Sequence, residues 1–443
     1  MKQEKALKAI FDVRRGELPL ALLMFSYFFL VITSFWILKP LKKALFIEFY
    51  DQGAFEFLGW SMTGPQAELI AKILNLAVAF AAVIVFTWLV RKYRRQQLAL
   101  IFTGFFLASY LLFMFVIGTP GELTIWSFYL FGDLFSTLMV ATFFAFLNDS
   151  VTPEAAKRLY GLIGLGGVSG GVFGSYVVAA FITQIERPQW LLICFVIGLA
   201  IALVAVVAGR LVDRNPPPEP EAPEISETQD ENRAASRNPA IEGALLVFRS
   251  RYLLSIVAIV GLYEIVSTIL DFQFTSTVVH YLQGPAIGEQ FSRVFAITNT
   301  VAMLVQLFLT GYVMSRLGVG VALLVLPVAV LAASAGFTAL PILWAGSLLN
   351  TADNGFSYSI NQSAKESLYV PTSKDEKYKA KAFIDMFVQR FAKAIAVLIS
   401  LAITSVFVEF SSIRWLSAVT IPLTLVWVLA AIYAGKRFRE LTE

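Results

Sequence analysis

The sequence has little of the side-chain chemistry on which most enzymes depend. Its 443 residues include one cysteine, Cys194, and one histidine, His280. A single cysteine can form neither an internal disulfide nor a cysteine-based metal site, and a single histidine excludes a histidine cluster. The sequence therefore does not support metal catalysis or Cys/His nucleophilic chemistry, and we expect neither a cofactor nor an enzymatic activity.

Charged residues are scarce too, at 15% of the chain, whereas hydrophobic residues make up 58%. Apolar runs of about 20 residues recur along the sequence, which is the length that crosses a bilayer as a helix. The first run follows a mixed-charge segment without an A-x-A cleavage site, so a removable signal peptide is not expected. The net charge of +4 is modest and gives no indication of nucleic-acid binding. These features predict an all-α polytopic membrane protein.

Twelve membrane spans are predicted, six on either side of a polar linker. The linker is acidic and rich in proline, a composition typical of an extended segment, and a short amphipathic stretch over residues 240–248 follows it. The predicted domains are a six-helix half over residues 1–209, a cytoplasmic linker over 210–250 and a second six-helix half over 251–443. The expected spans cover approximately residues 18–46, 69–90, 98–118, 123–147, 160–182, 190–208, 252–281, 294–312, 319–335, 341–364, 382–408 and 413–434.

The basic residues of the loops predict the orientation of the chain. With a cytoplasmic N-terminus, most of them lie in inner loops, and the outer loops hold only Arg187, Arg293 and Arg414. We therefore expect both termini on the cytoplasmic side of a bacterial-type inner membrane. Two six-helix halves with a cytoplasmic linker are typical of the major-facilitator fold, in which the substrate binds between the halves.

Three lysines, Lys39, Lys42 and Lys43, surround Pro40 in the first span. Lys39 and Lys43 share a helix face, and Lys42 lies beside them. Like charges at one level repel unless an anion or carboxylates compensate them. Two interpretations are open: the lysines anchor the span at the outer interface, or at least Lys42 faces a cavity and binds an anion.

Acidic residues also lie inside the predicted spans. Asp133 belongs to the fourth span, and Asp271 and Glu264 belong to the seventh. A carboxylate in such a position is either paired with a cation or carries a proton. The weaker candidates are Lys72 in the second span and Arg390 and Lys393 in the eleventh.

Glycines are concentrated between residues 161 and 174 in the fifth span. No strand precedes them and an apolar run follows, so the context excludes a phosphate-binding loop. Their spacing of three and four residues places small side chains on one helix face. This pattern predicts close helix packing.

The junction between the tenth and eleventh spans is the most charged segment of the chain. Lys365 and Glu366 directly follow the tenth span, Pro371 comes next, and lysines cluster over residues 374–381. Lys365 either faces a water-filled cavity and has a role there, or extends to the cytoplasmic surface.

This junction reads K-E-x-x-Y-(I/V)-P followed by K-x-K-x-K-A-x-x-D. It resembles the tenth-to-eleventh helix junction of the nucleotide translocase family, which includes the ATP/ADP exchangers of obligate intracellular bacteria and of plastids. Residues 38–42, 156–166 and 263–275 resemble three further motifs of that family, in the same order. The residues that carry the junction motif are Lys365, Glu366, Tyr369, Val370, Pro371, Lys377, Lys379, Lys381 and Asp385.

The resemblance implies a transporter that moves a phosphorylated anion, above all a nucleotide in ATP/ADP-type exchange. We expect it to work by alternating access and as a monomer. Two departures from the family's first motif are Pro40, in place of an acidic residue, and Lys43, where an acid is common. The implied substrate-binding residues are Lys42, Asp133, Asp271 and Lys365, with Lys39 beside them. The second-tier candidates are Lys43, Glu264, Glu366, Arg390 and Lys393.

Two other functions remain open at this stage. One is a proton-coupled major-facilitator porter of a non-nucleotide substrate, with Asp271 or Asp133 as the proton site. The other is a non-transporting sensor or assembly protein, in which the lysines of residues 374–381 hold a cytoplasmic partner or anionic lipid.

Overall fold

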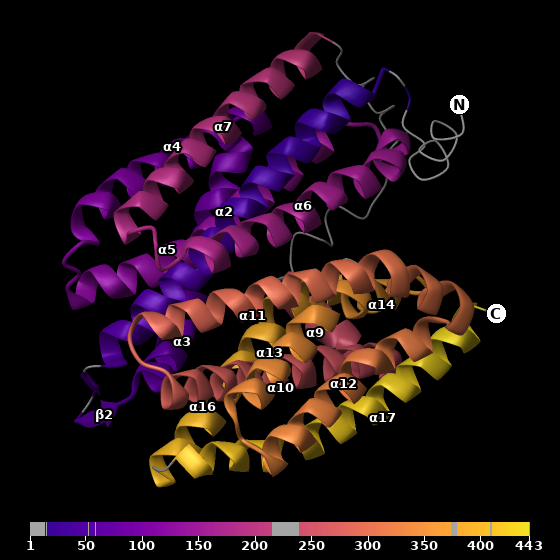
Figure 1. Ribbon diagram of the computed structural model, residues 1–443. Helices are drawn as coiled ribbons and strands as arrows, with labels where there is room; N and C mark the ends of the chain where they lie inside the picture. The colour runs from indigo at the N-terminus through magenta and orange to yellow at the C-terminus, as the bar shows by residue number, and fades with distance from the viewer. Residues whose placement is uncertain are drawn as a thin grey trace. The chain divides into compact units, whose positions relative to one another are not determined.

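The structure is a computed structural model and describes residues 14, 16–51, 53–57, 59–214, 239–373, 379–407 and 410–442. Most of the predicted linker, together with Lys374 and Lys377, lies outside these residues. Within the described chain, 11 helices are long and apolar enough to cross a membrane. The chain divides into two compact units (Figure 1).

The first unit is a helical bundle in which α2 packs against three neighbours, α5, α6 and α7. Helix α3 begins in the other unit and continues here from Leu74, and α11 contributes its first part. The helices of this unit are α2 (Leu18–Asp51), α3 (Gly64–Lys92), α4 (Arg95–Val116), α5 (Glu122–Ser150), α6 (Pro153–Phe181), α7 (Arg187–Arg214) and α11 (Pro285–Leu304).

The second unit holds residues 54–73, the rest of α11 and the helices that follow the linker. Its helix α10 packs against α13, α16 and α17. Its helices are α9 (Pro239–Arg249), α10 (Arg251–Tyr281), α12 (Val319–Ala339), α13 (Leu343–Phe356), α14 (Gln362–Ser367), α15 (Lys381–Phe383), α16 (Gln389–Val406) and α17 (Ser417–Thr442). Short π-helical or 3-10 segments cover Val305–Thr310, Val313–Leu317, Ser357–Asn361, Ile384–Val388 and Phe410–Leu416.

The predicted tenth span is helical but interrupted. It consists of α13, the π-helical turn Ser357–Asn361 and α14, which follow one another without a gap. Extra residues in such a turn shift the faces of a helix, and they occur often at functional sites. With this segment, the helical architecture matches the predicted all-α membrane fold.

The sequence analysis did not predict the small hairpin that precedes α3. Strands β1 (Phe55–Phe57) and β2 (Trp60–Met62) pair in antiparallel register, with Phe55 opposite Met62. Gly59 in the turn has a φ of 81°, a conformation that glycine adopts without strain. The hairpin belongs to the second unit together with the first residues of α3.

The glycine-rich face of α6 confirms the prediction of close packing. A Cβ at Gly166 would lie 2.6 Å from the carbonyl oxygen of Phe25, and one at Gly174 would lie 2.7 Å from that of Thr33. Both partners belong to α2, so the two backbones approach too closely for a larger residue. Small residues that allow such an approach are a common means of packing helices in membranes.

The outer surfaces of the helices are apolar. Large side chains such as Trp88, Phe115 and Leu203 in the first unit, and Phe308 and Trp344 in the second, are more than half exposed. Soluble proteins rarely show so many large exposed apolar groups, whereas a lipid-facing surface requires them.

Candidate functional site

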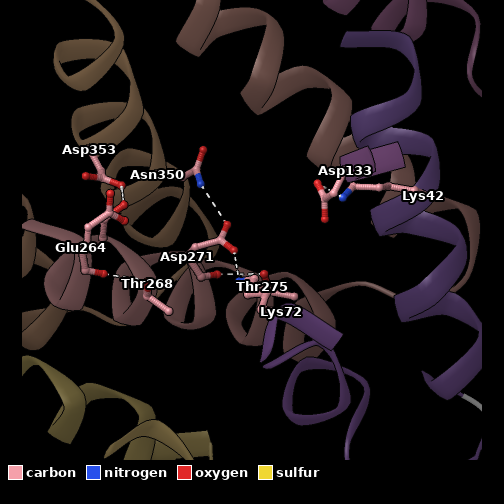
Figure 2. Close-up of polar contacts among 10 residues, drawn as sticks. Lys42, Lys72, Asp133, Glu264, Thr268, Asp271, Thr275, Asn350 and Asp353 are labelled. Carbon is pink, nitrogen blue, oxygen red and sulfur yellow. Dashed lines mark hydrogen bonds and ion pairs between the residues drawn. The ribbon is translucent and has the colours of Figure 1, made fainter. Parts of the chain in front are cut away.

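The first unit holds an ion pair between two spans. Lys42 of α2 forms this ion pair with Asp133 of α5 (Figure 2). The lysine is 5% exposed, and its ammonium group also lies 4.2 Å from the ring centroid of Tyr129. Pairing offsets the large free-energy cost of placing a charge inside the membrane.

Gly132 provides the space for this lysine. A Cβ at position 132 would lie 2.6 Å from Cδ of Lys42, so any larger residue would displace the lysine stem. The stem therefore crosses the backbone of α5 beside Asp133. The glycine that directly precedes Asp133 thus leaves the room that Lys42 needs to reach this carboxylate.

The other two lysines of α2 contact aromatic rings. The ammonium group of Lys39 lies 4.4 Å from the ring centroid of Trp36 and 5.0 Å from that of Phe295. Lys43 is 4% exposed and lies 5.3 Å from the centroid of Phe291. Ring faces attract cations, so these contacts offset part of the cost of placing three lysines close together.

The second unit holds a second ion pair. The ammonium group of Lys72, on α3, lies 2.5 Å from Oδ2 of Asp271, on α10 (Figure 2). Asn350 of α13 donates a hydrogen bond of 3.4 Å to the other carboxylate oxygen. About a quarter of each charged side chain is exposed, 24% for Lys72 and 25% for Asp271, so both remain accessible to a solute.

Further polar groups follow the same face of α10 toward its N-terminus. Ser267 donates a hydrogen bond of 2.6 Å to Asp353 on α13, and Glu264 lies 3.5 Å from the ammonium group of Lys393 on α16. Positions 264, 267 and 271 are three and four residues apart, so they share one helix face. Three helices therefore contribute to one polar surface inside the second unit.

The predicted residues of the junction form a separate group. Lys381 lies 2.5 Å from Glu366, and Lys365 interacts electrostatically with Asp385. These contacts connect the end of α14 with α15 and the turn after it. Arg390, one of the weaker candidates, is half-buried on α16.

The structure therefore brings the candidates together in pairs. Asp133 is the partner of Lys42, and Glu264 is the partner of Lys393. For Asp271, where the sequence left open an ion pair or a proton site, the partner is Lys72.

Sequence reasoning missed two polar residues of this surface, Asn350 and Asp353. Asp353 is 1% exposed and Asn350 is 2% exposed. A signal was present: Asn350, Asp353 and Ser357 interrupt an apolar run at spacings of three and four, which places them on one face of the tenth span. Intramembrane ionisable residues are by default candidates for function.

The arrangement suits the binding of an anion. A lysine ammonium acts as a compact cation, and phosphate oxygens, like carboxylate oxygens, accept charge-assisted hydrogen bonds from it. Both ion pairs have their acid and base on different helices, so each pair can open without breaking a helix. Ionisable groups inside membrane spans are typical of solute transporters built from two helical bundles.

Residues 20–373 match the family model described as Major Facilitator Superfamily. The match covers most of the chain, and the chain belongs to this superfamily. Solved structures agree on the fold: nucleoside transporter NupG has a TM-score of 0.60 at 12% identity, over 97% of this chain and 100% of that one. A POT family transporter in complex with 5-aminolevulinic acid has a TM-score of 0.65 at 11% identity, over 96% of each chain.

Residues 340–438 also match the family model described as TLC ATP/ADP transporter. "ADP,ATP carrier protein 2" of Chlamydia trachomatis serovar D is 25% identical over 98% of this chain and 91% of its own length. "Plastidic ATP/ADP-transporter" of Solanum tuberosum is 24% identical over 74% of this chain and 56% of its own length. The resemblance to the nucleotide translocase family, inferred from the sequence motifs, is confirmed.

Proposed function

We propose that this protein exchanges nucleotides across a membrane, one phosphorylated anion for another, in the manner of ATP/ADP exchange. The observation that carries the proposal is that each unit has, within its membrane spans, a lysine that forms an ion pair with a carboxylate. These pairs are Lys42 with Asp133 and Lys72 with Asp271. Relatives named as ADP,ATP carriers, aligned over nearly the whole chain, support the same substrate class.

In the proposed mechanism, the carboxylates occupy the lysines while no substrate is bound. Within either unit, a phosphate group of an arriving nucleotide replaces the carboxylate at the lysine, Asp133 at Lys42 or Asp271 at Lys72, as one charge-assisted contact is exchanged for another. Separating a lysine from its carboxylate inside the membrane is costly unless another anion takes the place of the carboxylate, so a change of conformation that opens a pair needs a bound phosphate. Each change between the inward-facing and outward-facing conformations then needs a bound anion. Transport of one nucleotide in one direction therefore requires return transport of a second nucleotide.

The test uses purified protein in liposomes. Uptake of labelled ATP should be fast when the liposomes contain ADP and at least about 10-fold slower when they contain buffer alone, because a return substrate is needed. Lys42→Met should lose most of this exchange, whereas Arg316→Gln, which removes an exposed cation from the turn Val313–Leu317, should retain it. Equal uptake with and without internal nucleotide would contradict the exchange mechanism.

A second candidate function rests on Glu264 and Asp353. Both carboxylates are buried in the second unit, at 9% and 1% exposure, and such groups are able to carry protons through a membrane. A proton-coupled porter would need a pH gradient and no internal nucleotide. The same liposomes, with the gradient imposed and then collapsed by an ionophore, separate the two functions.

The orientation and assembly of the chain belong to the proposal as well. We place both termini on the cytoplasmic side of a bacterial-type inner membrane, as the loop lysines and arginines favour. We also propose that a single chain is the working unit. Protease accessibility of the C-terminus in sealed vesicles tests the first statement, and the mass of the purified protein in detergent tests the second.

A further inference from the structure

A polar cavity of about 780 Å³ opens at one end of the second unit, away from the polar face of α10. It lies among four segments: the end of α9, the start of α10, the residues that follow α14 and the end of α17. None of its lining residues belongs to the ion pairs described above. Its lining includes Arg249, Arg251, Tyr252, Lys436, Arg437 and Glu440.

The lining of this cavity is strongly cationic. Four basic residues, Arg249, Arg251, Lys436 and Arg437, line it together with one acidic residue, Glu440. The carboxylate is already bound by Arg437, whose Nη1 lies 2.5 Å from its Oε2. Within the described part of the chain, no ion pair involves Arg249, Arg251 or Lys436, so the lining carries an excess of positive charge.

Neighbouring hydrogen bonds fix the start of α10 beside the cavity. The hydroxyl of Tyr252 donates a hydrogen bond of 2.7 Å to the carbonyl oxygen of Leu368, which joins the start of α10 to the segment after α14. Ser250, at the N-cap of α10, accepts a hydrogen bond from the backbone N–H of Leu253. The N-terminus of this long helix adds partial positive charge at the cavity.

The rim of the cavity indicates that its ligand is part of a membrane. Phe248 on α9, next to Arg249, is 69% exposed, and Leu441 on α17 is 48% exposed. Cationic groups beside exposed apolar ones suit a molecule with an anionic head and a hydrocarbon body. Basic pockets between transmembrane helices bind the headgroups of anionic lipids in this way.

We propose that this cavity binds the phosphodiester headgroup of an anionic phospholipid. Arg251, at the start of α10, and Lys436, near the end of α17, contact the phosphate oxygens. Phe248 and Leu441 contact the glycerol and upper acyl carbons. The site is independent of the nucleotide exchange proposed above, because it uses different residues and a different ligand.

Native mass spectrometry of the full chain in detergent tests the proposal, with phosphatidylglycerol and phosphatidylcholine of equal chain length as probes. The protein should retain phosphatidylglycerol much more strongly than phosphatidylcholine. The double substitution Arg251→Gln and Lys436→Gln should weaken it about 30-fold, the effect of losing two cations near an anionic lipid. The matched control is Arg439→Gln, which removes an exposed cation of α17 that does not line the cavity and should leave retention unchanged.

Three outcomes would overturn the proposal. They are equal retention of both lipids by the wild-type chain, equal loss in the Arg439→Gln control, and displacement of the lipid by inorganic phosphate or ATP at low millimolar concentration. The last would reassign the cavity to a soluble phosphate ligand. The comparison of lipids uses only the wild-type protein, so it decides the question even where a variant folds poorly.

Discussion

Lys72 and Asp271 are 199 positions apart in the sequence, and their side chains meet at 2.5 Å in one compact unit. The lysine comes from the start of α3, a helix whose remaining residues belong to the other unit. A second contact supports the same placement: Gln66 donates a hydrogen bond of 3.1 Å to Thr404 on α16. The first turns of α3 are thus attached to the second unit by polar contacts.

Reversing one charge of this pair should disturb the protein, and reversing both should repair it. Lys72→Asp or Asp271→Lys places like charges together. We expect each to destabilise the chain by about 2 kcal/mol, less than for a fully buried pair because solvent reaches both groups. The double swap restores an ion pair and should recover most of the loss. Thermal melting of the purified protein measures all three variants.

The control for the charge swap is the exposed pair of Arg293 and Glu289, whose side chains are 62% and 34% exposed. Swapping it should change the melting temperature little, since exposed pairs contribute only about 0–1 kcal/mol. A double swap of Lys72 and Asp271 that melts no higher than the single variants would show that the pair does not stabilise the fold.

The substitution Gly132→Ala tests the position of Lys42 without removing a charge. The added Cβ would lie 2.6 Å from Cδ of the lysine and should move it away from Asp133. Because misplacement of a binding group lowers transport efficiency, we expect nucleotide exchange to fall about 10- to 100-fold. The KM for nucleotide should rise, while the maximal rate changes less.

Gly104 provides the matched control. It lies inside α4, and a Cβ there meets no heavy atom within 4 Å. Gly104→Ala should leave exchange unchanged and stabilise the helix by up to about 1 kcal/mol. A full rate of exchange in Gly132→Ala would show that the position of Lys42 is unimportant for transport.

The sequence predicted the spans and the family because these depend on local patterns. Apolar runs and loop charges are read residue by residue, and the glycine spacing in α6 identified a packing face before its partner α2 was known. The motif around Lys365 identified the family in the same way. None of these inferences requires knowledge of which helices are neighbours.

The pairing of the charges could not be predicted, because it depends on contacts between distant helices. Nothing in the local sequence of Lys72 indicates that Asp271 is its partner. Asp353 was missed for another reason: it lies in a short polar stretch of an otherwise apolar span, and its spacing from Asn350 and Ser357 was overlooked. Its partner on α10, Ser267, is again distant in the sequence. The hairpin of β1 and β2 has strands of three residues, too short to give a clear alternating pattern.

The close packing of α6 against α2 gives a prediction about stability. In Gly170→Ala the new Cβ would collide with the carbonyl oxygen of Phe29, a backbone atom that cannot move aside without shifting α2. We expect a loss of about 1–3 kcal/mol, the usual effect of overpacking a tight interface. Gly161→Ala, in the same helix, meets no heavy atom within 4 Å and should be neutral or slightly stabilising. The two variants share a helix, a substitution and a change in helix propensity, so a difference in their melting temperatures isolates the contact with α2. Equal melting temperatures would mean that the helices do not approach each other as closely in the membrane.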